Sequence, residues 1–335
     1  MIAAHGFPTV YGRGLLAPLV ARLGRWVAIS QPEPWAQVAA SLDPAPAQLV
    51  MAGDLTRANL DRLVAELPRC DAVVGIGGGS AMDTAKWLHW RRQLPLYQVP
   101  SLPSVDACFT RPTAVRGGGR VCYEGDAVPE CVVVDFELIA AAPIELVRGG
   151  IGDVLSCHTA RFDWALATAR GQGPAWDESA AAASLMYLDE LAELAPLLAR
   201  GEDEGVRRLM ECLRDIGWRC HALGHARFEE GSEHFFGYAF EAVTGRTILH
   251  GELVTLGVLV MSALQHNDPE RARAIVGAAR TRSHPDALGV RWEEIEATLR
   301  RLPSFVAEQG LWYSQANELR VGDRELEVAR HALYR

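Results

Sequence analysis

The sequence GGGSAMDTAK at residues 77–86 follows a short apolar run, residues 72–76, and opens a helical pattern. Three successive glycines allow the chain to turn sharply and to approach a ligand closely. The N–H groups of the first helical turn then face outward at the positive end of the helix dipole, an arrangement that binds phosphate or pyrophosphate. A strand-to-helix turn with no ligand would use the same glycines, so the stretch by itself predicts a β–α unit and leaves its ligand open.

The first 145 residues alternate between strand and helix patterns. Helices are expected at 34–42 and 55–67, the second with Leu60, Leu63 and Leu67 on one face. Strands are expected at residues 26–30, 48–52, 72–76, 96–99 and 131–134. This alternation predicts a Rossmann-like α/β domain with a parallel sheet. Its ligand site should lie at the carboxyl ends of the strands, where the glycine turn is.

The pattern changes after Pro143, where strand signals nearly vanish. Long helical patterns follow at residues 153–169, 177–198, 206–221, 234–243 and 251–265. A chain of 335 residues is long enough for two domains. The sequence therefore predicts a nucleotide-binding α/β domain at 1–145 and an all-helical, metal-binding catalytic domain at 146–335.

Composition excludes several classes of protein. The net charge is −9 and the basic residues are dispersed, which argues against a nucleic-acid partner. The longest apolar stretch, residues 253–264, is too short to cross a bilayer, and the N-terminus lacks the pattern of a signal peptide. Seven scattered cysteines form no C-x-x-C pair, which favours a reduced, cytoplasmic protein.

Three residues of the helical half are candidate ligands of one divalent cation: Asp153, His234 and His250. Each lies near a predicted helix start. One carboxylate with two imidazoles suits Zn²⁺ or Fe²⁺ and leaves coordination positions open for a substrate. Their spacing does not identify a site, because Asp153 could simply cap a helix and the two histidines could be hydrogen-bonded at helix ends.

Six segments, in order along the chain, resemble one known superfamily. They are GIGGGSAMDTAK at 75–86, VPSLPSVD at 99–106, VVVDFELIAAAP at 132–143, GIGDVLSCHTARFDWALA at 150–167, EEGSEHFF at 229–236 and LHGELVTLGVL at 249–259. The sequence thereby resembles the iron-containing alcohol dehydrogenase, glycerol dehydrogenase and dehydroquinate synthase superfamily, and within it the glycerol-1-phosphate dehydrogenases. The resemblance implies a dehydroquinate synthase-like fold and a homo-oligomer that acts on a small molecule.

The resemblance also implies roles for individual residues. Asp153, His234 and His250 match the ligands of a catalytic divalent metal, for which zinc is the first choice and iron or nickel the alternatives. Contacts to NAD or NADP are expected from Gly77, Gly78, Gly79, Ser80, Asp83, Ser101, Ser104 and Thr110. Substrate contacts are expected from Asp106, which would also assist catalysis, and from Tyr238, Arg111 and Arg116.

The chain departs from the family pattern at positions that bear on substrate and cofactor. Val105 and Tyr238 stand where the phosphate-specific enzymes have histidine, and Ser80 replaces a common lysine. Gln31 stands where many NAD-specific relatives carry aspartate for the adenosine ribose, which leaves the choice between NAD and NADP open. Arg111 and Arg116 are candidates for replacement anion contacts, and ordinary solvated loop charges are the alternative reading.

The expected activity is that of an NAD(P)-dependent, metal-containing polyol dehydrogenase. It would interconvert a small polyol, phosphorylated or not, with its hydroxy-ketone or aldehyde. One alternative is a dehydroquinate synthase-like cyclase that uses NAD transiently, although such relatives carry glutamate where this chain has Asp153. The other is a nucleotide-binding protein without catalytic activity.

Overall fold

A computed structural model describes residues 6–103, 106–117 and 120–334 of the chain. These residues form two units. The first runs to Val147 and also includes Leu213–Ala222, and the second comprises Arg148–Cys212 and the chain from Leu223 onward. The predicted boundary at 145/146 lies close to the end of the first stretch of this unit at Val147. The assignment of Leu213–Ala222 to the first unit was not predicted.

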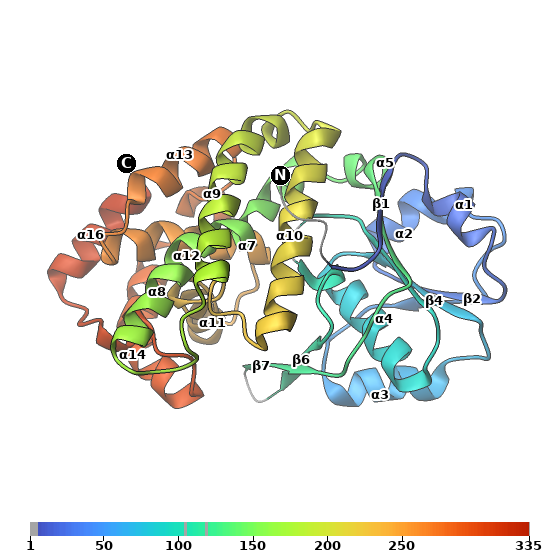
Figure 1. Ribbon diagram of the computed structural model, residues 1–335, viewed down its shortest axis with the longest axis horizontal. Helices are drawn as coiled ribbons and strands as arrows, with labels where there is room; N and C mark the ends of the chain where they lie inside the picture. Colours follow the sequence, from blue (N-terminus) through green and yellow to red (C-terminus); the bar gives the residue numbers. More distant parts are fainter. Residues whose placement is uncertain (1–5, 104–105, 118–119, 335) are drawn as a thin grey trace. The chain divides into compact units, whose positions relative to one another are not determined.

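The first unit contains a six-stranded, fully parallel sheet with strand order β1-β8-β5-β4-β2-β3 (Figure 1). Its strands are β1 (Thr9–Gly12), β2 (Trp26–Ser30), β3 (Gln48–Met51), β4 (Ala72–Gly77), β5 (Leu96–Pro100) and β8 (Cys131–Asp135). Its helices include α1 (Leu16–Val20), α2 (Pro32–Val38), α3 (Arg57–Glu66), α4 (Gly79–Arg92), α5 (Phe136–Ala140) and α6 (Ile144–Arg148). The predicted parallel α/β fold is confirmed.

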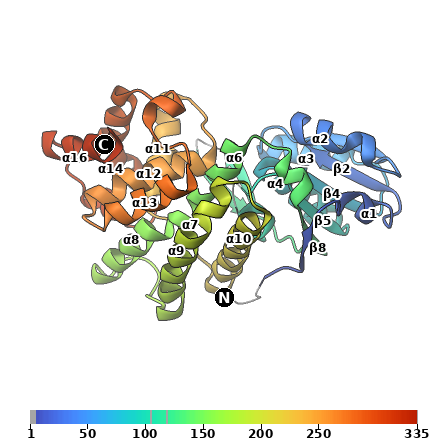
Figure 2. The same ribbon diagram turned by 90° about the horizontal axis from the view of Figure 1, so that it is seen from above.

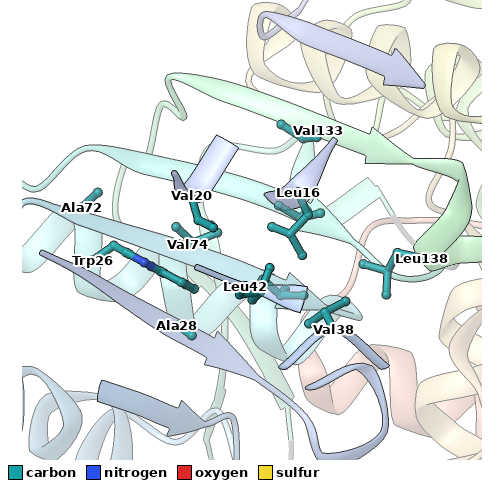
Figure 3. Close-up of a cluster of buried hydrophobic side chains, with 12 residues drawn as sticks. Leu16, Val20, Trp26, Ala28, Val38, Leu42, Ala72, Val74, Val133 and Leu138 are labelled. Carbon is teal, nitrogen blue, oxygen red and sulfur yellow. The ribbon is translucent and has the colours of Figure 1, made fainter. Parts of the chain in front are cut away.

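Apolar side chains on both faces explain why the central strands are fully buried. On one face, Trp26 and Ala28 of β2 and Val74 of β4 pack with residues of α1, α2 and α5 (Figure 3). On the other face, Val27, Ile29 and Val73 pack against α3 and α4. Strands covered by helices on both sides are typical of parallel sheets, and they read in sequence as continuous apolar runs.

Two β features were not predicted from the sequence. The edge strand β1 contains no apolar run, and its Val10 is exposed. The segment after Thr110, for which no strand was predicted, forms an antiparallel hairpin of β6 (Thr113–Gly117) and β7 (Arg120–Glu124). Neither of these short strands shows the alternation of apolar and polar residues that marks a half-buried strand.

The second unit is helical (Figure 2). Its elements include α7 (Gly152–Leu155), α8 (Cys157–Ala169), α9 (Glu178–Ala199), α11 (Ser232–Thr244), α12 (His250–Leu264), α13 (Pro269–Ala279), α14 (Trp292–Gln309), α15 (Gln315–Glu318) and α16 (Asp323–Tyr334). The change to helices after Pro143 is as predicted, but α13, α14 and α16 were not. Among the described residues, no helix is both long and apolar enough to span a bilayer.

Helix α10 (Asp203–Leu223) is shared between the two units. Its second half belongs to the first unit because Gly217 lies directly against the backbone of Phe109, where a Cβ atom would meet the Phe109 carbonyl oxygen at 2.7 Å. His221, one turn later, also contacts the Arg111 guanidinium at 3.3 Å.

Candidate functional site

The three predicted metal ligands come together in the second unit. Asp153 Oδ1 lies 3.8 Å from His234 Nε2 and 3.3 Å from His250 Nε2. One ligand atom from each residue falls within 4.8 Å of the other two. Asp153 and His234 are buried, whereas the His250 side chain is 40% exposed. His250 is therefore the most solvent-accessible of the three residues.

Glycines next to the ligands allow the helices that carry them to cross closely. Gly152 precedes Asp153 in α7, and Gly251 follows His250 in α12. A Cβ atom on Gly152 would lie 2.6 Å from Gly251 Cα, so these two backbones touch. Likewise, a Cβ atom on Gly257 would lie 2.5 Å from the carbonyl oxygen of Glu233, next to His234. Backbone contact of this kind holds α7, α11 and α12 at the distance that the three ligands require.

Glu233 orients the imidazole of His234. Its Oε1 accepts a hydrogen bond from His234 Nδ1 at 2.9 Å and one from the Gly231 N–H at 2.6 Å. Its Oε2 accepts from the Thr159 hydroxyl at 2.6 Å. Because Nδ1 carries a proton toward Glu233, Nε2 is the nitrogen directed at Asp153 and His250, and its lone pair becomes available to a metal ion that displaces the second proton.

The electrostatics of the cluster are dominated by carboxylates. Burial by itself lowers the pKa of His234, but the hydrogen bond and charge of Glu233, together with Glu229 and Asp153, outweigh it and raise that pKa to about 10. Such a concentration of negative charge around a buried imidazole favours a cation.

The donor set fits a divalent cation. One carboxylate oxygen and two imidazole nitrogens converge, and the second nitrogen of His234 is tied to a carboxylate, as is usual for histidine ligands of metals. Three protein ligands, one of them partly exposed, match the catalytic zinc sites, which keep a coordination position open, better than the closed four-ligand structural sites.

The glycine turn of the first unit lies between β4 and α4, as predicted. Gly77 has a φ of +154°, and a Cβ atom there would meet Gln31 Oε1 at 2.7 Å and Ala81 Cβ at 2.9 Å. Gly78 differs, because its φ is −86° and a Cβ atom would find its nearest neighbour at 3.5 Å. The fold therefore requires glycine at Gly77, whereas a Cβ atom at Gly78 would make only ordinary contact with Gln31.

Gln31 has a role that sequence reasoning missed. Its Oε1 accepts a hydrogen bond from the Gly78 N–H at 2.8 Å. The end of β2 is thus connected directly to the glycine turn, and the residue considered only for its effect on the adenosine ribose also holds the backbone of this turn. The next two residues, Gly79 and Ser80, begin helix α4, and their N–H groups belong to its first turn.

Asp83 and Lys86 form a buried ion pair at 2.7 Å. The Lys86 ammonium also donates to the Thr110 hydroxyl at 3.1 Å and to the Pro112 carbonyl oxygen at 2.6 Å. Asp83 therefore faces Lys86, and the pair fixes the segment that carries Thr110. Direct contact between Asp83 and a cofactor stays a prediction, whereas an indirect role through Thr110 has a visible structural basis.

The remaining predicted residues of the first unit are placed as follows. Ser101 is buried, and its N–H donates to the Gly77 carbonyl oxygen at 2.9 Å. Asp106 begins the short 3-10 helix η2 (Asp106–Cys108) and is half-buried. Ser104 and Val105 lie outside the described residues.

The two candidate arginines have structural partners. The Arg111 guanidinium pairs side-on with Asp126, which also lowers the pKa of that carboxyl group. Its donors on that edge are therefore engaged at the base of the hairpin. Arg116 is exposed on β6, where its N–H donates to the Leu55 carbonyl oxygen at 2.9 Å. Substrate contact stays a prediction for both, and Arg111 would have to make it with the guanidinium donors that do not face Asp126.

Tyr238 lies one turn after His234 in α11. Its hydroxyl donates to Glu230 Oε1 at 2.8 Å, and its ring centroid is 6.3 Å from that of His234. The structure thus places Tyr238, a predicted substrate residue, next to His234, one of the three candidate metal ligands. It adds Glu230, which belongs to the EEGSEHFF segment at 229–236 but had been given no role.

Comparison with known proteins agrees with the motifs. The family model for iron-containing alcohol dehydrogenases matches residues 35–143. A glycerol-1-phosphate dehydrogenase [NAD(P)+] of Hyperthermus butylicus is 34% identical over 61% of this chain and 58% of its own length. The chain thus matches about three fifths of that relative.

Two solved structures share the fold over 99% of this chain with a TM-score of 0.72. They are a probable glycerol dehydrogenase from Sinorhizobium meliloti, 21% identical with 97% of its chain covered, and a glycerol dehydrogenase from Schizosaccharomyces pombe, 19% identical with 91% covered. The expected Rossmann-like domain with a helical second domain is confirmed by this likeness.

Proposed function

We propose that this chain, a member of the iron-containing alcohol dehydrogenase superfamily, is a metal-dependent, NAD(P)-linked oxidoreductase. It interconverts a small polyol and its hydroxy-ketone or aldehyde. The observation that carries the proposal is the convergence of Asp153, His234 and His250, of which His250 is partly exposed, in a chain that also has a glycine turn with room for a further atom at Gly78.

The residues have distinct tasks in this proposal. Asp153, His234 and His250 hold the metal, which would supply Lewis-acid polarisation of the substrate oxygen. The N–H groups after Gly78 hold the pyrophosphate of the nucleotide, whose nicotinamide would supply or accept the hydride. Glu233 fixes His234, and Lys86 fixes the Thr110 segment. Asp106 would orient a second hydroxyl group of the substrate.

The finer assignments are part of the proposal. Zinc suits one carboxylate and two imidazoles without any redox requirement, and Fe²⁺ or Ni²⁺ suits the same donors. Gln31 presents no carboxylate to a 2′-phosphate, so both NADH and NADPH belong in the assay. The expected small-molecule specificity, oligomerisation and cytoplasmic location remain predictions.

The test is nicotinamide turnover by protein reconstituted with Zn²⁺, Fe²⁺ or Ni²⁺. We expect one NADH or NADPH oxidised for each hydroxy-ketone reduced, and about one metal ion per chain. His250→Ala should lose the metal and the turnover while NAD(P)H still binds, because two remaining ligands hold a divalent ion poorly. Ring formation without net turnover would instead identify a cyclase, and nucleotide binding with no product would identify a non-catalytic binder.

A further inference from the structure

Tyr238 and Glu230 form a hydrogen-bonded pair close to the candidate metal ligand His234. The chemistry of this pair bears on whether the substrate is charged or uncharged. Both side chains are half-buried. The Tyr238 hydroxyl donates its proton to Glu230 Oε1 at 2.8 Å, and the Tyr238 ring lies near His234. The pair therefore presents one phenolic oxygen and the remaining acceptor positions of a carboxylate. These groups can accept hydrogen bonds from hydroxyl groups, whereas a phosphate dianion brings only acceptors.

The surrounding charges are also negative. The charged groups that act most strongly on His234 are all carboxylates, namely Glu233, Glu229 and Asp153. Glu230 adds a further carboxylate through Tyr238. A divalent cation would offset two of these charges, so the neighbourhood would remain negative with the metal bound.

The nearby cation Arg227 does not provide an anion site. Its side chain is fully buried. One terminal nitrogen donates to the Glu230 carbonyl oxygen at 3.2 Å and the other to the Tyr313 carbonyl oxygen at 2.7 Å. Arg227 therefore braces the backbone beneath Glu230, and its single positive charge is shared among three carboxylates, those of Asp163, Glu233 and Glu230.

We infer that the Tyr238–Glu230 pair is a specificity determinant that selects an uncharged polyol or hydroxy-ketone and rejects its phosphate ester at the metal cluster. The inference rests on the proposed function, because it concerns the substrate of the same site. Glu230 accepts a substrate hydroxyl group and repels a phosphate group, and Tyr238 holds the Glu230 carboxylate in place.

The experiment compares equilibrium binding of dihydroxyacetone and dihydroxyacetone phosphate to Zn²⁺-loaded protein containing NAD(P)+, so that no turnover is needed. Wild-type protein should bind the uncharged ketone more tightly. Glu230→Gln keeps an acceptor for Tyr238 but removes the charge, and the ratio of the two dissociation constants should shift about tenfold toward the phosphate ester. Tyr238→Phe should weaken dihydroxyacetone binding several-fold, with the metal content unchanged.

Glu270→Gln is the matched control, because it makes the same change in net charge at an exposed residue of α13 paired with Arg273. It should leave the ratio unchanged. Tighter binding of the phosphate ester by wild-type protein, or an equal shift in both variants, would overturn the inference. The proposed function is judged separately by nicotinamide turnover, so a protein that reduces dihydroxyacetone phosphate efficiently would remain a dehydrogenase while the specificity inference failed.

Discussion

At the scale of single residues, Glu233 orients the imidazole of His234 in the candidate metal site. It accepts hydrogen bonds from His234 Nδ1, the Gly231 N–H and the Thr159 hydroxyl while being fully buried. Glu233→Ala should weaken Zn²⁺ binding by about 10- to 100-fold, because the imidazole loses the partner that sets its tautomer and orientation. Chelator competition measures this affinity.

Two variants separate this role from a general loss of packing. Glu233→Gln retains an oxygen acceptor for His234 Nδ1 and should recover most of the affinity. Thr159→Val removes the hydrogen bond to the other carboxylate oxygen at nearly constant volume and should have a smaller effect than Glu233→Ala. Unchanged Zn²⁺ affinity in a folded Glu233→Ala protein would show that His234 needs no such partner.

At the scale of secondary-structure elements, the two glycines in the turn from β4 to α4 are expected to have different roles. The fold needs glycine at position 77, and the proposed nucleotide site needs it at position 78. Gly77→Ala should destabilise the protein, because its Cβ atom would collide with Gln31 and Ala81 at a φ of +154°. Gly78→Ala should fold normally and lose affinity for NAD(P)H, because the added methyl group occupies only the space where the pyrophosphate would approach. Thermal melting and fluorescence titration measure the two effects, and full affinity in Gly78→Ala would mean that the glycine turn has no ligand.

The candidate metal site also depends on the close crossing of helices α7 and α12. Gly152→Ala would push its Cβ atom into the Gly251 backbone and force the two helices apart. We expect a loss of about 1–3 kcal/mol in the free energy of unfolding, together with weaker metal binding as Asp153 moves away from His250. Gly277→Ala in α13 is the control, since a Cβ atom there meets nothing within 4 Å and alanine should stabilise the helix slightly. Equal metal affinity in the two variants would contradict this dependence.

At the scale of the whole molecule, stability should depend on the metal. All three ligands belong to the second unit, so a metal that binds only the folded form stabilises that unit. At a free metal concentration of about 100 times the dissociation constant, this amounts to about 2.7 kcal/mol, or a rise of roughly 5–10 °C in Tm for a unit of this size. Calorimetry with and without a chelator measures the shift, and His250→Ala should show none. An equal Tm in both conditions would mean that no tightly bound metal is present.

The sequence by itself determined the architecture of the first unit and the identity of the candidate ligands. Buried parallel strands read as continuous apolar runs, so β2, β4 and β5 were recognisable, and the glycines after β4 marked the turn. The strand β1 and the β6–β7 hairpin were missed because short strands with mixed residues carry little periodic signal. Asp153, His234 and His250 were identified by motif, since their spacing carries no helical or strand repeat.

Only the tertiary structure decided which of these residues meet, and how they are held. Helix crossings at Gly152 and Gly257 depend on backbone-to-backbone contact, which leaves no pattern along the chain. Buried polar groups must find partners wherever the fold provides them, and those partners are distant in sequence: Gln31 for Gly78, Thr159 for Glu233, and Thr110 for Lys86. The sequence could therefore name the candidate ligands, while the packing of helices around them determined their distances, their hydrogen-bond partners and the carboxylates that surround them.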